Sequence, residues 1–142
     1  MKQIIRTTNY PGLIIRVVVG LIFLSEGIQK FLYPELLGSG RFEKLGIHPA
    51  VFWSACTGCF EITCALLIIL GWFTRLAVVP LAIIMVVAFE ATKLPEWIDN
   101  GFWTMLHDGR TDFAMTMLLI FLFINGSGNY SVDFSNYAKR KN

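Results

Sequence analysis

Charged residues are scarce in this chain. Asp, Glu, Lys and Arg make up 15% of its 142 residues, whereas a soluble domain usually carries about a quarter. Apolar residues make up 55% of the chain, and its length corresponds to one domain. The composition therefore excludes an ordinary soluble domain and indicates a single integral membrane domain, residues 1–142, with the lipid bilayer as its surroundings.

Several functional signatures are also missing. The chain contains no Walker-type loop, dinucleotide fingerprint or HExxH motif. The net charge is only +2, and no basic cluster is interleaved with aromatic residues, so nucleic acid is not an expected partner. The first apolar stretch lacks a small-x-small cleavage site, and we interpret it as a retained span rather than a secretory signal.

Cysteine is rare, and its three copies exclude a complete disulfide framework. Cys56 and Cys59 form a CxxC, but they lie inside an apolar run rather than at a helix start, where such pairs are activated. Two alternatives stay open for them: a redox-active pair, or ordinary packing of small apolar side chains. Neither His48 nor His107 has metal-ligand spacing to the cysteines, so no metal site is predicted.

What the chain does have is four long apolar runs. A helix needs about 20 mostly apolar residues to cross a bilayer. The expected spans cover residues 11–32, 51–73, 76–91 and 111–126. A tight turn joins the second span to the third, and polar loops at 34–49 and 99–108 join the others, with Pro95 and Trp97 marking the exit of the third span. The predicted fold is an all-α, four-helix transmembrane bundle with short loops.

An even number of spans places both termini on one side of the membrane. Six Lys and Arg residues lie in the two tails and the Arg75 turn, against four in the polar loops and their flanks. This bias favours cytoplasmic termini in a bacterial inner membrane. Trp53, Trp72, Trp97 and Trp103 fall near the predicted span ends, as an interfacial aromatic belt would place them.

Six charged residues lie inside or beside the apolar runs, where an unpaired charge costs several kcal/mol. They are Arg16, Glu26, Lys30, Glu61, Glu90 and Lys93. Glu26 and Lys30 are four residues apart, and Glu90 and Lys93 are three apart, so each pair is expected to form within its own helix.

Glu61 has no basic neighbour within its own helix and needs a partner from another span. Arg16, Lys30 and Arg110 are the candidates. Glu61 shares a helix face with the small residues Ser54, Thr57, Gly58 and Ala65. Because small residues allow helices to approach closely in membranes, this face is expected to point into the bundle.

With a rise of 1.5 Å per residue, the charges other than Arg16 fall in the middle or non-cytoplasmic half of the bundle. Two interpretations follow: a network that only locks the helices together, or a polar pocket that handles protons or binds a ligand. In the second, the candidate catalytic acids are Glu61 and Glu26. The candidate ligand-binding residues are Arg16, Lys30, Glu90, Lys93, Arg110 and Asp112.

Several motifs together resemble the DoxX family of small membrane proteins. The first is Arg16-x3-Gly20-Leu21-x-Phe23-x3-Gly27-x2-Lys30, and the second is Gly58-x-Phe60-Glu61 followed by Leu66 to Ala77. Arg110-x-Asp112 and the ending Gly126-x-Gly128-x-Tyr130-Ser131-x-Asp133 complete the pattern. The resemblance covers most of the chain and implies a four-helix transmembrane bundle.

The resemblance also implies a role near redox chemistry. Relatives are linked to thiosulfate–quinone oxidoreduction, or to membrane complexes with sulfurtransferase or superoxide dismutase partners in oxidative-stress defence. We therefore expect a membrane subunit that supports redox or sulfur metabolism or oxidative-stress defence, with a buried charged pocket and with membrane or periplasmic redox proteins as partners. Whether it is an enzyme stays open, with a subunit of a quinone-linked oxidoreductase as one option and quinone as the candidate cofactor. The alternatives are a non-catalytic scaffold, a small-solute transporter and, for assembly, a homo-oligomer.

Overall fold

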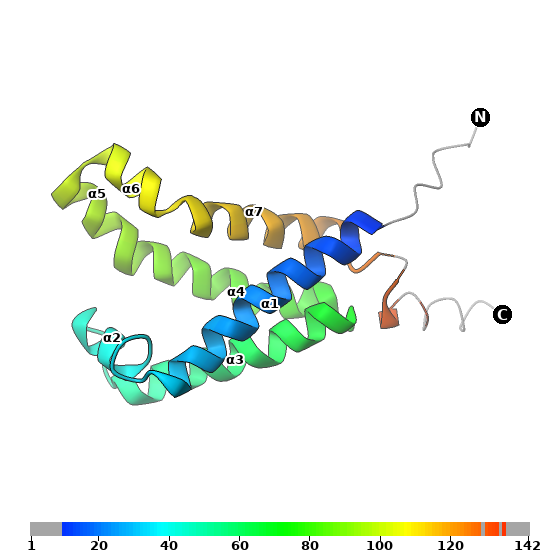
Figure 1. Ribbon diagram of the computed structural model, residues 1–142, viewed down its shortest axis with the longest axis horizontal. Coiled ribbons are helices and arrows are strands. Elements are labelled where there is room, and N and C mark those ends of the chain that lie inside the picture. The colour runs from blue at the N-terminus through cyan, green and yellow to red at the C-terminus, as the bar shows by residue number, and fades with distance from the viewer. Residues whose placement is uncertain (1–9, 129, 134, 136–142) are drawn as a thin grey trace.

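The computed structural model describes residues 10–128, 130–133 and 135, and its regular elements are helices (Figure 1). In chain order they are α1 (Tyr10–Leu32), α2 (Ser39–Lys44), α3 (Ala50–Leu70), α4 (Thr74–Ala88), the π-helix η1 (Phe89–Lys93), α5 (Leu94–Asn100), α6 (Phe102–Asp108) and α7 (Arg110–Asn125).

Three helical stretches are long and apolar enough to cross a membrane. They are Gly12–Leu32 and Ala50–Leu70, each of 21 residues, and the continuous rod Thr74–Asn100, of 27 residues, that α4, η1 and α5 form together. The predicted all-α membrane architecture is therefore confirmed. At 16 residues, α7 is shorter than the roughly 17 to 25 residues of a usual crossing.

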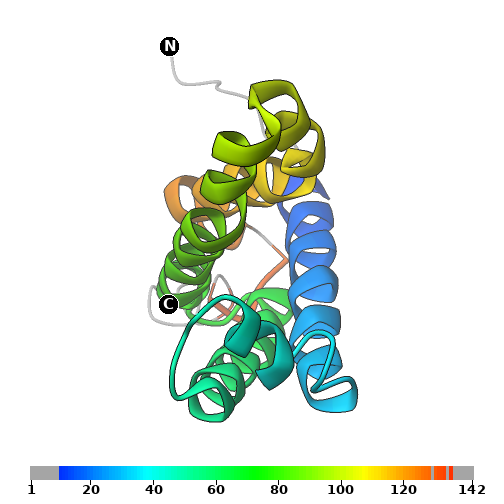
Figure 2. The same ribbon diagram turned by 90° about the vertical axis from the view of Figure 1, so that its left-hand side faces the viewer.

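The long helices run up and down and close a ring. α1 packs on α3, α3 on α4, α4 on α7, and α7 back on α1, as Figure 2 shows from one end of the molecule. The start of α1, the α3–α4 turn at Gly71 and the end of α7 lie together, and we call this the Gly71 end (Figure 1). α2 and the hairpin of α5 and α6 lie at the opposite end, which we call the hairpin end.

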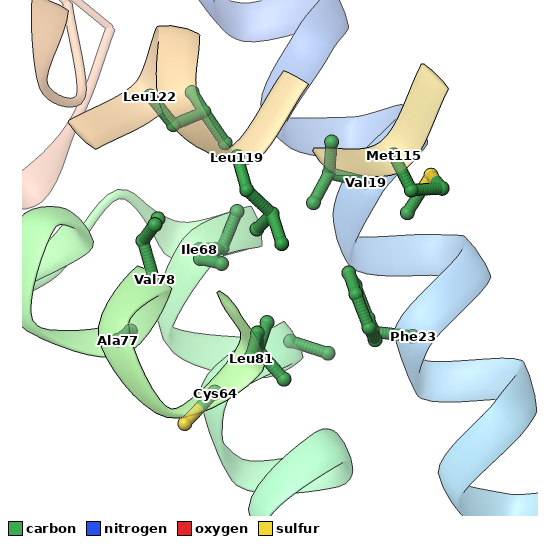
Figure 3. Packing of buried hydrophobic residues seen from close by; sticks show 11 residues of the cluster. Val19, Phe23, Cys64, Ile68, Ala77, Val78, Leu81, Met115, Leu119 and Leu122 are labelled. Atoms are coloured by element: carbon green, nitrogen blue, oxygen red, sulfur yellow. The ribbon is translucent and has the colours of Figure 1, made fainter. Parts of the chain in front are cut away.

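The apolar core is concentrated toward the Gly71 end. Side chains from α1, α3, α4 and α7 converge there (Figure 3). On α1, Val19 and Phe23 are 0% and 3% exposed, whereas Glu26, three residues further along the same stripe, is exposed. On α7, Leu119 and Met115 are buried, but the Asp112 side chain keeps 38% of its surface. The inward faces of α1 and α7 therefore become accessible toward the hairpin end.

Three predictions were wrong, all at the hairpin end. The expected loop at 34–49 contains the helix α2. The third span was expected to stop at 91, but the helix continues to Asn100. Pro95 lies within this rod, directly after the π-helix η1, and the helix continues past it. Residues 99–108 were expected to form a loop, yet they include α6, which turns back on α5 at Gly101.

Candidate functional site

The shortest ion pair in the described part of the chain joins α1 to α3. Lys30 Nζ lies 2.6 Å from Glu61 Oε2, and the two side chains are 11% and 4% exposed. Lys30 comes from the last turn of α1, and Glu61 from the middle of α3. At this distance the contact is a charge-assisted hydrogen bond. Of the three predicted candidate partners for Glu61, the structure selects Lys30.

Close helix approach brings this pair together. A Cβ atom on Gly27 would lie only 2.9 Å from the carbonyl oxygen of Gly58 and 3.0 Å from Cβ of Glu61. On α3, Ser54, Gly58 and Glu61 are buried along one stripe. Ala65, also on this stripe, is fully buried. The predicted inward face of the second span is thus found, with small residues permitting the contact.

Glu26 does not take the place expected for it. It is exposed, and within the described residues no ion pair joins it to Lys30, whose ammonium group bonds Glu61 instead. The physical reason is burial, because an unpaired charge costs more at the enclosed Glu61 than at the accessible Glu26.

Lys93 forms a second set of ion pairs, but not with Glu90 as predicted. Its Nζ lies 3.6 Å from Oε2 of Glu96 and 3.8 Å from Oδ2 of Asp112. Glu90 and Lys93 both belong to η1, whose π-turn holds more residues than an α-turn, so residues three apart no longer share a face. Because Asp112 lies in the first turn of α7, Lys93 links the long rod to α7.

Arg110 forms its hydrogen bond at the start of α7 rather than with Glu61. It is exposed, and its Nη1 donates a hydrogen bond of 2.7 Å to the carbonyl oxygen of His107. His107 and Asp108 are exposed residues of α6. The structure therefore gives Glu61 no contact with Arg110, and the guanidinium stabilises the connection between α6 and α7.

Arg16 lies at the Gly71 end, apart from the other predicted residues. It is 0% exposed, and its Nη2 donates a hydrogen bond to the carbonyl oxygen of Tyr130. Within the described residues, its Nε and Nη1 have no hydrogen-bond partner. Its guanidinium lies directly against the backbone of Gly71. Arg16 therefore holds the C-terminal segment to the bundle rather than pairing with Glu61.

Asp133 completes this second polar cluster, which the sequence reasoning did not identify as a site. Its carboxylate accepts hydrogen bonds from the backbone N–H groups of Phe73, at 2.9 Å, and Thr74, at 3.3 Å. Its own N–H donates to the carbonyl oxygen of Gly71 at 3.1 Å. Asp133 thus caps the start of α4 and the end of α3. The only sequence signal for it was its place in the family-like ending.

The cysteines are all free. Cys56 is partly buried, Cys59 is exposed and Cys64 belongs to the apolar core. Within the described residues, no group of His, Cys, Asp and Glu side chains is arranged to hold a metal ion. The roles expected for Cys56 and Cys59 stay as the two alternatives stated from the sequence.

Known proteins of similar sequence exist for this chain. The profile of the DoxX family matches residues 12–94, more than half of the chain. An uncharacterized membrane protein of Mycobacterium tuberculosis (strain ATCC 25618 / H37Rv) is 47% identical over 138 residues, which cover 92% of this chain and 85% of the relative. No solved structure matches the chain.

Proposed function

This chain belongs to the DoxX family, and from that premise we propose that it is a membrane subunit supporting redox or sulfur metabolism or oxidative-stress defence. The working group in this proposal is the Lys30–Glu61 pair. The observation that carries it is the 2.6 Å contact between two side chains that are 11% and 4% exposed. Ionisable groups inside membrane helices are costly and mark proton or ligand pathways.

In this proposal Glu61 is the proton-handling or ligand-orienting acid, and Lys30 holds its carboxylate in place. Glu26, Lys93 and Asp112 lie toward the same end of the bundle and supply the remaining polar groups, where the inward faces of α1 and α7 become accessible. The redox cofactor in this proposal is a quinone, and the carboxylate of Glu61 would exchange protons with it. Glu90 and Arg110 lie at the edge of this polar region. Arg16 holds the C-terminal segment to the bundle at the Gly71 end.

The proposal also includes the topology. α7 is the fourth crossing, and its 16 residues are accommodated by local thinning or by tilt of neighbouring helices. The charged hairpin end then faces away from the cytoplasm, and the termini lie on the cytoplasmic side of a bacterial inner membrane. Fusing a reporter that is active only outside the cytoplasm to the α5–α6 turn tests this orientation.

Glu61→Gln tests the proton role because it removes the ionisable group and keeps the size of the side chain. We expect quinone reduction by purified membranes supplied with thiosulfate to fall by about 100-fold or more, the usual contribution of a general acid or base. Glu43→Gln is the matched control, since Glu43 is an exposed residue of α2 and lies outside the pair. Full activity of Glu61→Gln would contradict the proton role of Glu61.

A scaffold role is the second candidate, and a specific observation favours it. The Lys30–Glu61 pair lies beside a close contact of α1 with α3, at Gly27 and Gly58, so it also fixes how these helices pack. The double variant Lys30→Met/Glu61→Met replaces the pair with apolar side chains of similar length. If it folds and supports activity in membranes, the scaffold is favoured; if it folds and is inactive, the ionisable pair is needed.

A further inference from the structure

The α5–α6 hairpin is almost entirely surface. Within residues 94–108 only Met105 is buried, and the two helices pack chiefly on each other. The large apolar side chains exposed there form what we call the aromatic tip: Trp97, Ile98, Phe102, Trp103 and Leu106. Ile98 and Trp103 are each 78% exposed. Such a concentration of exposed apolar groups marks a surface that contacts another protein or the membrane.

Helix length places the aromatic tip beyond the lipid tails. The rod Thr74–Asn100 has 27 residues, which is about 40 Å at 1.5 Å per residue and about 38 Å along the membrane normal at an average tilt of about 20°. The hydrocarbon layer is about 30 Å thick. When exposed Trp72 is placed at the membrane interface of the Gly71 end, the excess of about 8 to 10 Å falls at the aromatic tip.

The rim of the aromatic tip is acidic. Glu96, Asp99 and Asp108 lie within the hairpin, and no Lys or Arg occurs between Lys93 and Arg110. Lys93 is engaged with Glu96 and Asp112, and Arg110 donates to the carbonyl oxygen of His107. Asp99 and Asp108 are both exposed. This negative charge is unfavourable beside anionic lipid headgroups and favourable beside a basic protein surface.

We propose that the aromatic tip is the docking surface for a partner protein with an apolar centre and a basic rim. Trp and Phe are enriched at the centres of protein interfaces, where they carry much of the binding energy. Opposite charges around that centre orient the partner and raise the association rate. The surface uses none of the residues of the Lys30–Glu61 pair, so it does not depend on the function proposed for them.

Thiol labelling tests this docking surface in the full-length chain. Ile98→Cys is introduced after Cys56, Cys59 and Cys64 have been replaced by Ala, and its rate of reaction with a membrane-impermeant maleimide is measured. Open membrane fragments of the native cell are compared with nanodiscs of zwitterionic lipid that hold only this protein. Leu36→Cys is the matched control, because Leu36 is 69% exposed in the connection between α1 and α2.

We expect Ile98→Cys to react at least 10-fold more slowly in native membranes than in nanodiscs, while Leu36→Cys reacts equally in both. Adding Asp99→Lys and Asp108→Lys should restore fast labelling in native membranes, because the rim would then repel a basic partner. Equal rates for Ile98→Cys in both preparations overturn the proposal. Slow labelling in both, or protection that survives charge reversal, also overturns it, since lipid or a second copy would then cover the tip.

Discussion

The guanidinium of Arg16 lies where a side chain on Gly71 would have to go. A Cβ atom on Gly71 would overlap Nη1 of Arg16, and Cβ of Ser131 would be only 2.5 Å away. Gly71 also has a left-handed backbone with φ of +68°. The first half of α1, the end of α3 and the C-terminal segment are therefore joined at one residue that has no side chain.

Gly71→Ala should destabilise the protein more than its backbone strain alone accounts for. A left-handed conformation costs a non-glycine residue about 1–2 kcal/mol, and displacing Arg16 adds to that. Gly46→Ala is the control, since Gly46 has φ of +73° and nothing within 4 Å of an added Cβ. Denaturant unfolding in detergent measures both variants. Equal losses of unfolding free energy would show that the contact with Arg16 contributes nothing.

Breaking the Lys30–Glu61 pair on one side should cost more than removing it. Lys30→Met or Glu61→Met leaves one uncompensated buried charge, which costs about 3–5 kcal/mol, whereas replacing both partners is often close to neutral. The unfolding free energies of the two single variants and the double variant form a cycle that isolates the coupling between the residues. Additive losses would contradict the 2.6 Å contact.

Gly27→Ala should disrupt the packing of α1 against α3. The added Cβ would lie 2.8 Å from Cγ1 of Ile62 and 2.9 Å from the carbonyl oxygen of Gly58, and the backbone atom cannot move aside easily. Overpacking of this kind costs about 1–3 kcal/mol. Gly12→Ala on the same helix meets nothing closer than 3.9 Å. It should be neutral or stabilise the helix by about 0.5–1 kcal/mol. Thermal unfolding distinguishes the two variants.

Asp133→Asn should loosen the start of α4. The carboxylate accepts hydrogen bonds from the N–H groups of Phe73 and Thr74, and an amide can replace only one of its two oxygens. Loss of a helix cap costs about 0.5–2 kcal/mol. Hydrogen exchange of these two amides should accelerate in Asp133→Asn, while Asp108→Asn should leave it unchanged. Unchanged exchange in both variants would argue against the cap.

The inward face of α3 was predictable because it follows from a helical period and the positions of small residues. Glu61, Gly58 and Ala65 fall on that face in any α-helix with this sequence, and they are buried. The same helical period gave the wrong ion pair for Glu90 and Lys93, because a π-turn changes which residues share a face. The prediction also failed after Pro95, where the rod continues directly after the π-helix η1 although proline usually ends a helix.

The sequence by itself determined that this is an all-α membrane protein, where α1 and α3 lie, and which carboxylate needed a partner. These properties depend on local composition and on the helical repeat. Only the tertiary structure decided which polar groups each buried charge meets. Arg16 and Tyr130 are 114 positions apart, and Lys30 and Glu61 are 31 apart. Such contacts depend on which helices become neighbours and at what height, and no local pattern specifies either.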